Sequence, residues 1–223
     1  MEVPNKNTMK HLGQEVYSDG NLVFKFYDGY FERHPDIEVE ALRRVQDIKG
    51  VQQFVDYDPD NKILVTKLAR GHLLDEKSDE FKSGNLHYTT SQLESLFKTL
   101  TGMQEKGVFF ETHAKNIFYD SSQGFTPIDY HIPNEAHIDL GALIGILSIR
   151  GVPVGREFGI ARPMNGMNRQ HHPNVREMVY DAFRHVNPDM AAKEINRLER
   201  TEKVFQDLSD RLKTSYLGYE IPT

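Results

Sequence analysis

The stretch GVFFETHAKNIFYDSSQGFTPIDYH, residues 107–131, decides the fold that we predict for this chain. Two short apolar runs, residues 117–119 and 125–128, are separated by the Ser-Ser-Gln-Gly sequence of residues 121–124. Short runs of strand-forming residues on either side of a turn with Ser and Gly are typical of a β-hairpin. We therefore predict a hairpin near the centre of the chain.

Polar residues occupy both ends of this predicted hairpin. Glu111, His113 and Asn116 precede the first strand, and Asp129 follows the second. A hairpin brings its entrance and its exit together, so carboxylate and amide oxygens from both ends can meet at one point. Mg²⁺ binds oxygen ligands of this kind, usually one or two carboxylates with substrate phosphates and water. The pattern indicates a magnesium site at the base of the hairpin.

The spacing also resembles that of a known family. Glu-x-His-x-x-Asn at residues 111–116, followed by Ile-Asp-Tyr at residues 128–130, is similar to the catalytic and metal-binding loops of the protein-kinase-like superfamily. Those loops read Asp-x-x-x-x-Asn and Asp-Phe-Gly. The histidine two residues after the first acid resembles the aminoglycoside and choline kinases and several phage and bacterial effector kinases. The chain departs from the family at Glu111, where the family has its catalytic Asp.

The resemblance implies a role for each of these side chains. Asn116 and Asp129 would hold Mg²⁺ across the phosphate oxygens of ATP, and His113 would lie near the γ-phosphate. Glu111 would orient the acceptor hydroxyl and take its proton. Glu is one methylene longer than Asp, which moves the carboxylate by roughly 1 Å, and such a misplacement can lower a rate about 10²-fold. Glu111 therefore implies either a loop rebuilt around the longer side chain or a protein that binds nucleotide without transferring phosphate.

The first part of the chain is predicted to be small and rich in strands. Residues 15–17 and 22–27 are two predicted strands around a Ser-Asp-Gly-Asn turn. Lys25 lies between two phenylalanines in the second strand, and this window alone favours an outward-facing lysine on an alternating strand. In the kinase-like interpretation, Lys25 is the third-strand lysine that binds the ATP phosphates. Gly13 stands where the family has a glycine-rich loop over the phosphates, so the resemblance implies a shortened or replaced loop.

Residues 36–47 have apolar side chains at helical spacing after a Pro-Asp start signal, and we predict a helix there. Glu38, with Leu42 and Val45 four and seven residues behind it, resembles the acid of the family's αC helix, which pairs with the third-strand lysine. This spacing favours Glu38 over Glu40. Without the resemblance, Glu38 would be interpreted as a solvated acid on an amphipathic helix.

Two further strands, at residues 54–57 and 62–68, are predicted around an Asp-Pro-Asp-Asn turn. The Arg-Gly pair at residues 70–71 and the change from strand to helix periodicity indicate a linker. By the resemblance, this linker is the hinge between two lobes. Thr66 would then occupy the gatekeeper position, and the backbone of Lys67–Ala69 would face adenine.

The second part is predicted to be mostly helical. Ser91 and Glu94 have the spacing of a capping box, and the apolar face of the helix that follows ends near Lys106–Gly107. Asp139 opens an apolar helix that resembles the family's αF helix, in which an Asp braces the catalytic loop from below. Only nine residues separate Asp129 from Asp139, so the resemblance implies an activation segment that is nearly absent.

The last third of the sequence combines a loop with two helices. Residues 152–172 are rich in Gly, Pro, Asn and Arg, and we interpret them as an exposed loop whose His171–His172 pair lacks partners at metal-ligand spacing. Helices are predicted at residues 174–186 and from Asn187–Pro188 onward, where Pro takes the first helical position. The apolar face of the last helix consists of Ile195, Leu198, Phe205, Leu208 and Leu212. This face predicts packing either on the helical part or on a partner.

The composition of the 223 residues, 38% hydrophobic and 27% charged, is that of a globular protein with a core. The net charge of -6 gives no electrostatic basis for binding nucleic acid or an anionic membrane. The absence of Cys excludes a disulfide framework and a thiolate metal site. The amino-terminal residues 1–13 lack the apolar core of a signal peptide, and no apolar run approaches the length of a membrane span, so we expect a cytoplasmic protein. Secretion into a host cell without a cleaved signal is compatible with the sequence.

Together these patterns predict an α+β, bilobal protein-kinase-like fold, with a strand-rich N-lobe at residues 1–69 and a helical C-lobe at residues 70–223. We expect an atypical kinase that transfers the γ-phosphate of Mg-ATP to a protein Ser or Thr hydroxyl, acts as a monomer and binds a protein substrate or regulatory partner. The minimal layout resembles bacterial secreted effector kinases and phage kinases. Two alternatives stay open: a pseudokinase that acts as a nucleotide-binding interaction module, and a small-molecule phosphotransferase.

Overall fold

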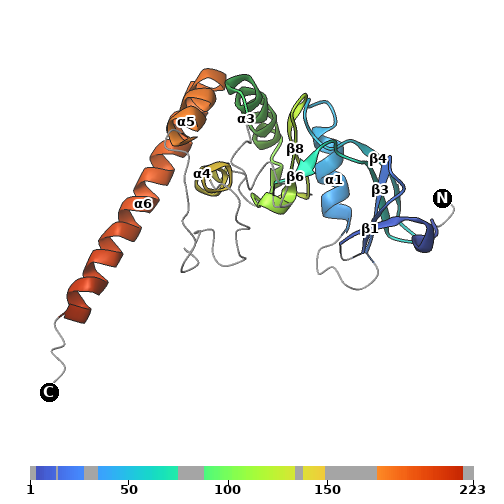
Figure 1. Cartoon of the computed structure of the whole chain (residues 1–223), viewed down its shortest axis with the longest axis horizontal. Coiled ribbons are helices and arrows are strands. Elements are labelled where there is room, and N and C mark those ends of the chain that lie inside the picture. The colour runs from blue at the N-terminus through green and yellow to red at the C-terminus, as the bar shows by residue number, and fades with distance from the viewer. Residues whose placement is uncertain are drawn as a thin grey trace, which may run out of the picture.

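The computed structural model of the chain describes residues 4–13, 15–27, 35–74, 88–133, 138–148 and 175–217. The predicted loop at residues 152–172, with its three arginines and two histidines, lies outside the described residues. The described elements form a strand-rich part, a hairpin region and a helical part, which follow one another along the long axis of the molecule (Figure 1).

A five-stranded antiparallel sheet makes up most of the strand-rich part, in the order β1-β2-β3-β5-β4. The elements here are η1 (Lys6–Thr8), β1 (Lys10–Gly13), β2 (Val16–Ser18), β3 (Leu22–Phe26), β4 (Phe54–Asp58) and β5 (Ile63–Lys67). Both predicted strand pairs are confirmed, because β2 pairs with β3 and β4 with β5 across the predicted turns. β3 and β5 pair along their whole length and form the centre of the sheet.

The two central strands give the sheet two different faces, because successive side chains of a strand point to opposite sides. On one face, Phe24 and Phe26 of β3 pack with Ile63 and Val65 of β5 in a small core of their own. The intervening residues of both strands face the other side. That inner face is directed toward the rest of the molecule.

Helix α1 (Pro35–Val45) lies between the sheet and the hairpin region (Figure 1). Its apolar side chains Val39, Ala41, Leu42 and Val45 are buried in the same core as Leu64 from the inner face of the sheet, whereas Ile37 in the first turn is exposed. The predicted helix is thereby confirmed, with its end two residues earlier than predicted.

The connection from the sheet to the hairpin region depends on Gly71. Its φ of +87° lies in the region that favours glycine, and a Cβ here would be 2.0 Å from the carbonyl oxygen of Tyr119. The next residues form the short strand β6 (His72–Leu73), which pairs with Phe118 and Tyr119 of the hairpin region. The predicted division of the chain after residue 69 falls just before this glycine and stays a prediction.

The hairpin region contains two small antiparallel ladders. Its elements are β7 (Phe109–Phe110), η2 (Ala114–Asn116), β8 (Ile117–Asp120), β9 (Gly124–Pro127) and β10 (Tyr130–His131). β8 and β9 form the predicted hairpin, with Ile117 opposite Pro127. β7 and β10 pair beyond its open end, with Phe110 opposite Tyr130. The two ladders hold both ends of the loop 111–116 next to residues 128 and 129.

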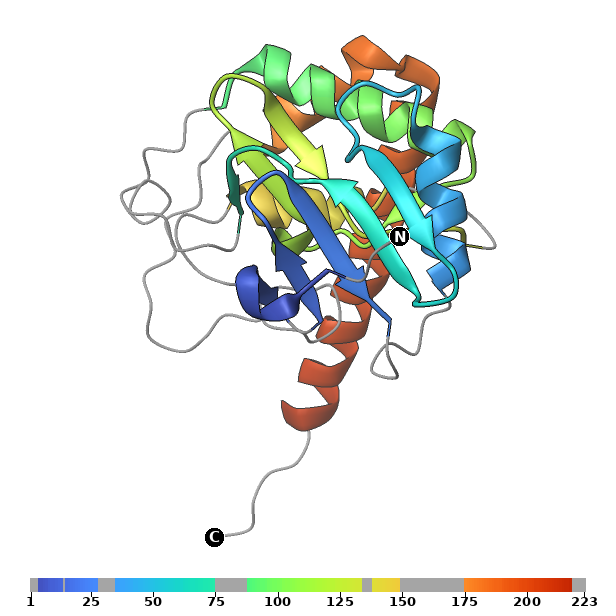
Figure 2. The ribbon, with the colours of Figure 1, turned by 90° about the vertical axis from the view of Figure 1, so that its right-hand side faces the viewer.

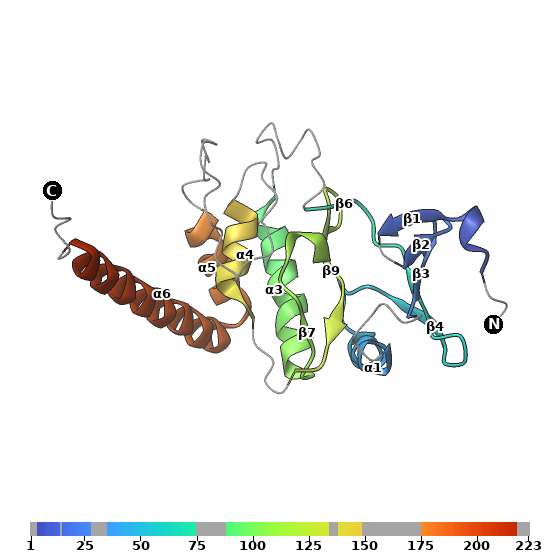
Figure 3. The same ribbon diagram turned by 90° about the horizontal axis from the view of Figure 1, so that it is seen from below.

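The helical part contains α3 (Thr90–Glu105), α4 (Leu140–Ser148), α5 (Val175–Val186) and α6 (Pro188–Leu217). Phe97 of α3 and Phe183 of α5 are fully buried and stack with their ring centroids 4.5 Å apart. Figure 2 looks onto the sheet with these helices behind it, and Figure 3 shows the same succession of sheet, hairpin region and helices from below.

The predicted start of α3 is wrong by two residues. Thr89 is the N-cap, and Thr89 with Gln92 forms the capping box, in place of Ser91 with Glu94. Both pairs have the required spacing. The structure selects Gln92 because its side chain also donates a hydrogen bond to the carbonyl of Ser121 at 2.9 Å, which joins α3 to the hairpin turn. The predicted end near Lys106–Gly107 is confirmed.

The last helix, α6, packs on the molecule over only part of its length. In its first half, Ile195 is buried and Leu198 packs against the core. Farther along, Val204, Phe205 and Leu208 are more than half exposed. Figure 1 shows this end of α6 extending away from the other helices. As far as residue 208, the predicted apolar face therefore contacts the helical part at Ile195 and Leu198, and the side chain of Leu212 lies outside the described residues.

The chain is an α+β protein, as predicted, with a strand-rich part and a mainly helical part. Within the described ranges, every helix is too short or too polar to cross a membrane.

Candidate active site

A cleft of about 210 Å³ opens between the sheet and the hairpin region. Its lining residues are Val16, Val23, Lys25, Glu38, Gln52, Leu64, Thr66, Asn116, Ile128 and Asp129. Half of these were singled out from the sequence, namely Lys25, Glu38, Thr66, Asn116 and Asp129. The fold thus brings residues that are far apart in the sequence to one place.

One part of the cleft is apolar. Val16 and Val23 line it from the sheet, and Ile128 lines it from the hairpin region. A slot between aliphatic side chains accepts a flat ring, while the polar groups at its other end suit charged substituents of that ring. These aliphatic residues could not be found from the sequence, because a valine in a strand indicates no more than strand propensity.

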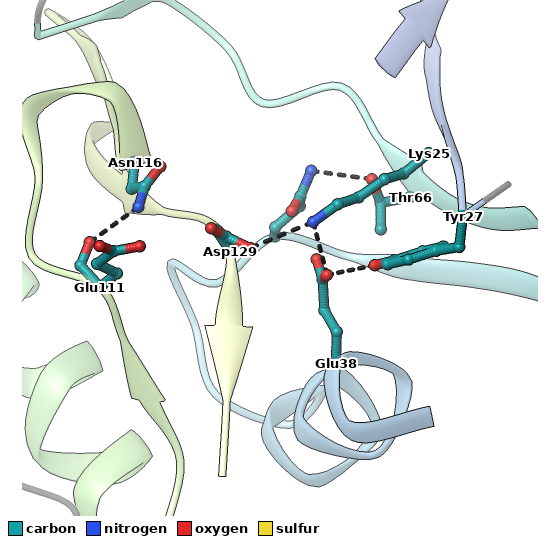
Figure 4. A network of polar contacts seen from close by, with 8 residues as sticks. Lys25, Tyr27, Glu38, Thr66, Glu111, Asn116 and Asp129 are labelled. Carbon is teal, nitrogen blue, oxygen red and sulfur yellow. Dashed lines mark hydrogen bonds and ion pairs between the residues drawn. The ribbon is translucent and has the colours of Figure 1, made fainter. Parts of the chain in front are cut away.

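Lys25 is the centre of the polar end. Its Nζ lies 2.6 Å from Oε2 of Glu38 and 3.2 Å from Oδ1 of Asp129 (Figure 4). Burial lowers the pKa of Lys25, but the two carboxylates outweigh burial, and the net pKa is raised. Lys25 is therefore a fixed cation in the cleft. Glu40, the alternative to Glu38, is exposed and pairs with Arg44.

Tyr27 belongs to this network, although the sequence motifs did not include it. Its hydroxyl donates a hydrogen bond to Oε2 of Glu38, the same oxygen that binds Lys25. Tyr27 is buried, and burial together with the charge of Glu38 raises its pKa, so the hydroxyl keeps its proton. The sequence signal that could have indicated this contact is the two-residue spacing, which places residues 25 and 27 on one face of a strand.

Asp129 has a backbone conformation that is rare for a non-glycine residue, with a φ of +63°. Its neighbours hold this conformation. The N–H of Ile128 donates to the carbonyl of Asn116 at 2.8 Å, and Tyr130 pairs with Phe110 in the β7–β10 ladder. Backbone strain of this kind concentrates at functional sites. In this structure it directs the Asp129 carboxylate into the cleft (Figure 4).

The side-chain amide of Asn116 has a defined orientation. Its Nδ2 donates to the backbone carbonyl of Glu111 at 3.0 Å, so its oxygen faces away from that carbonyl (Figure 4). An amide oxygen and the Asp129 carboxylate on one cleft are suitable Mg²⁺ ligands, provided that phosphate and water oxygens complete the shell. Among the described residues, no group of three or more His, Asp or Glu side chains is placed to hold a metal ion alone, so ligands from a nucleotide and water would have to complete the shell here. The residues present therefore fit a magnesium–nucleotide complex.

Glu111 lies at the edge of this site. Phe110 pairs with Tyr130 in an antiparallel ladder, so Glu111, which follows Phe110, and Asp129, which precedes Tyr130, lie at the same end of the ladder. The Glu111 side chain is exposed, and Figure 4 shows it near Asn116 and Asp129. It is not among the residues that line the cleft.

His113 has a local structural role. Its Nδ1 accepts a hydrogen bond from the N–H of Lys115 at 3.2 Å, so the ring caps η2. Like Glu111, it is absent from the cleft lining. Its predicted place near the γ-phosphate stays a prediction.

The residues predicted to face adenine and the phosphates differ in their positions. Thr66 is buried and lines the cleft, and its hydroxyl accepts a hydrogen bond from Nε2 of Gln52 at 2.9 Å. Lys67 and Ala69 follow at the end of β5 and are not among the lining residues. Gly13 lies at the end of the exposed strand β1, also outside the lining. A phosphate-covering role for the turn at Gly13 stays a prediction.

Asp139 does not act as the predicted brace. The apolar helix α4 begins directly after it, as predicted, and its Oδ1 accepts a hydrogen bond from the N–H of Ala142 at 3.0 Å. Asp139 therefore caps α4. Among the described residues, no hydrogen bond or ion pair connects it to the loop 111–116. A short polar side chain before a helix caps that helix readily, and the sequence pattern does not separate this role from a brace.

Comparisons with known proteins give a likeness in fold. No protein-family model matches the chain, and no curated protein matches it. Among solved structures, it is similar to WbdD in a co-crystal with the kinase inhibitor LY294002, at 16% identity and a TM-score of 0.46, over 62% of this chain and 36% of that chain. The kinase PK-1 of the Cydia pomonella granulovirus gives 13% identity and a TM-score of 0.38, over 53% of this chain and 48% of that chain.

A high-resolution structure of WbdD gives 15% identity and a TM-score of 0.41, with the same shares of both chains. The chain thus spans between about a third and a half of the length of the solved chains that it matches.

Proposed function

We propose that this chain is an ATP-dependent phosphotransferase of the protein-kinase-like type, which transfers the γ-phosphate of Mg-ATP to a Ser or Thr hydroxyl of a protein. One observation carries the proposal. A single cleft combines an aliphatic slot, a buried lysine–glutamate pair, and amide and carboxylate oxygens at its polar end. The slot suits a purine ring, the lysine suits phosphates, and the two oxygens suit a divalent ion.

The polar side chains have separate roles in this proposal. Lys25 binds the α- and β-phosphates, and Glu38 keeps Lys25 in place. Asn116 and Asp129 hold Mg²⁺, which when bound neutralises charge on the phosphate oxygens. Phosphoryl transfer requires positioning and charge neutralisation more than covalent help from the protein. Thr66 and the backbone of Lys67–Ala69 border the adenine.

The acceptor side of the site is formed by the loop that precedes β8. Glu111 orients the acceptor hydroxyl and takes its proton, and His113 lies near the γ-phosphate. The exposed position of the Glu111 side chain supports this role, because an acceptor can reach it from solvent. The short interval between Asp129 and Asp139 leaves little chain to cover this side. A folded protein therefore fits as the acceptor, and we propose that the enzyme acts as a monomer in the cytoplasm of its own or of a host cell.

A nucleotide-binding interaction module is the second candidate. The observation that favours it is Glu111 itself, which lies outside the cleft lining and carries one methylene more than Asp. If the longer side chain misplaces the carboxylate, the chain binds Mg-ATP but transfers no phosphate. The two candidates share the nucleotide site and differ only at the acceptor.

The test is transfer of labelled phosphate from ATP in the presence of Mg²⁺ to a generic protein acceptor. Wild type is compared with Lys25→Ala and Glu111→Gln, and with Glu202→Gln as a surface control far from the cleft. Removal of a general base lowers rates by about 10²-fold or more, so Glu111→Gln is expected to lose transfer. Lys25→Ala is expected to lose it as well, because the cation proposed to bind the phosphates is gone, while the control keeps it. Thermal stabilisation by Mg-ATP without transfer would indicate the interaction module. Transfer to small hydroxyl compounds alone would indicate a small-molecule phosphotransferase.

A further inference from the structure

Tyr27 touches the Lys25–Glu38 pair but has no part in the function proposed above. It follows Lys25 by two residues, so both side chains leave the same face of the strand and reach the same residue of α1. Tyr27 is 5% exposed and Glu38 is 8% exposed. The tyrosine is therefore an internal connection between β3 and α1.

The carboxylate of Glu38 is shared between two donors. Its Oε2 accepts a hydrogen bond from the ammonium of Lys25 at 2.6 Å and another from the hydroxyl of Tyr27. Nζ of Lys25 also lies 5.3 Å from the centroid of the Tyr27 ring, within the range of a cation–π contact. A buried carboxylate needs each of its donors, because an unsatisfied charge is costly inside a protein. Tyr27 thus constrains both members of the ion pair.

We propose that Tyr27 is a positioning residue that holds Glu38, and through it Lys25, in the arrangement that binds nucleotide phosphates. This inference rests on the proposed function for its consequence in nucleotide binding. Besides the Lys25–Glu38 ion pair, the Tyr27 hydroxyl forms a second bond from the β3 segment to α1, and this hydroxyl keeps its proton. With this bond inside the chain, the lysine–glutamate pair forms without a modification or a partner protein.

The direct test compares Tyr27→Phe with Tyr57→Phe. Burial and the charge of Asp36, which lies on the same helix, raise the pKa of Tyr57, so Tyr57→Phe removes a tyrosine hydroxyl near a carboxylate of α1 without touching Glu38. Loss of a hydrogen bond to a charged group changes an equilibrium constant about 10-fold or more. Tyr27→Phe is therefore expected to raise the dissociation constant of Mg-ATP about 10-fold, as measured by calorimetry. Adenosine, which has no phosphates, is expected to bind both variants like wild type.

A double-mutant cycle separates positioning from a general structural effect. In a Lys25→Ala background, Tyr27→Phe is expected to cause no further loss of Mg-ATP affinity, because its effect passes through Lys25. A loss that persists in this background overturns the proposal. So does an equal loss of adenosine binding.

A second readout needs no nucleotide. Acylation of Lys25 by acetic anhydride, followed by peptide mass mapping, reports how firmly its amine is paired in the folded, nucleotide-free protein. Tyr27→Phe removes one of the two donors that hold the Glu38 carboxylate, so Lys25 is held less firmly and is expected to be acylated several-fold faster than in wild type. Tyr57→Phe is expected to leave this rate unchanged. An unchanged rate in Tyr27→Phe overturns the positioning role. If wild type binds no Mg-ATP, the proposed function fails, while this rate still decides the role of Tyr27.

Discussion

Two ion pairs of equal length join neighbouring elements in two regions of this molecule. Lys25–Glu38 links β3 to α1, and Arg176–Glu202 links α5 to α6, each with a nitrogen–oxygen distance of 2.6 Å. The side chains of the first pair are 17% and 10% exposed, and those of the second are 43% and 50% exposed. The distance therefore does not distinguish the two pairs, and the solvent around them does.

The difference shows what burial adds to an ion pair. An exposed pair contributes about 0–1 kcal/mol, because water and salt screen it and two long side chains must be ordered. A buried pair gains little over an apolar replacement, yet removal of one partner costs about 3–5 kcal/mol, since the other charge is left in a poorly solvated site. Lys25–Glu38 must therefore be kept whole, whereas Arg176–Glu202 is dispensable.

The largest effect is expected at Asp129, the second carboxylate next to Lys25. Asp129→Ala removes a metal ligand in the proposed function, and loss of one preorganised electrostatic group in an active site lowers turnover by on the order of 10³-fold. The measurement is transfer of labelled phosphate from Mg-ATP. Labelling that survives this substitution would contradict the metal assignment. The buried network around Lys25 would then matter no more for phosphate transfer than the exposed Arg176–Glu202 pair.

The next effect concerns stability. Lys25→Met leaves Glu38 with Tyr27 as its remaining partner in the network, and we expect a loss of about 3 kcal/mol in the free energy of unfolding, measured in urea. The double variant Lys25→Met/Glu38→Leu removes both charges and is expected to recover most of this loss while it stays inactive. A double variant that is as unstable as the single one would show that the pair itself, rather than the unpaired acid, carries the stability.

The pH dependence of the same pair gives a smaller effect. The folded-state pKa of Lys25 is raised above its ordinary value of 10.5, so its contribution is fully present below that value and is lost as pH rises through the higher folded-state pKa. The difference in unfolding free energy between wild type and Lys25→Met is therefore expected to be constant from about pH 7 to 9 and to shrink above about pH 10.5. A difference that shrinks already below pH 9 would contradict the raised pKa.

The smallest effect is expected at the exposed pair. Glu202→Gln should lower the free energy of unfolding by about 0.5 kcal/mol at low ionic strength, and by less in about 1 M salt, where screening acts within a few ångströms. Urea unfolding at both salt concentrations checks this. A loss as large as that of Lys25→Met would remove the contrast between the two regions.

Much of the local structure could be predicted from the sequence. Turn residues and alternation were sufficient for the hairpin of β8 and β9 and for the paired strands of the sheet, because these signals act between near neighbours. Helical spacing placed Glu38, rather than Glu40, on the face of α1 that contacts Lys25. The roles of these side chains in chemistry stay predictions.

The errors have a common origin in contacts between distant parts of the chain. Two capping boxes were available at the start of α3, and the contact of Gln92 with the hairpin turn selected the earlier one. Asp139 was predicted to support the loop 111–116, but it caps its own helix. Tyr27 carried no motif, and only the approach of α1 to β3 shows what it binds.

The sequence by itself determined the order of strands and helices, the turn at the centre of the chain, and the polar residues at its ends, since periodicity and turn chemistry depend on residues close in sequence. Only the tertiary structure decided which aliphatic residues line the cleft, which donors share the Glu38 carboxylate, and that Ile195 of α6 is covered while Val204, Phe205 and Leu208 are exposed. These features depend on packing between segments far apart in the chain, and no local pattern encodes which surfaces will meet. The left-handed backbone of Asp129 belongs to the second group, because the pairing of β7 with β10 and the hydrogen bond from the N–H of Ile128 to the carbonyl of Asn116 hold it in place.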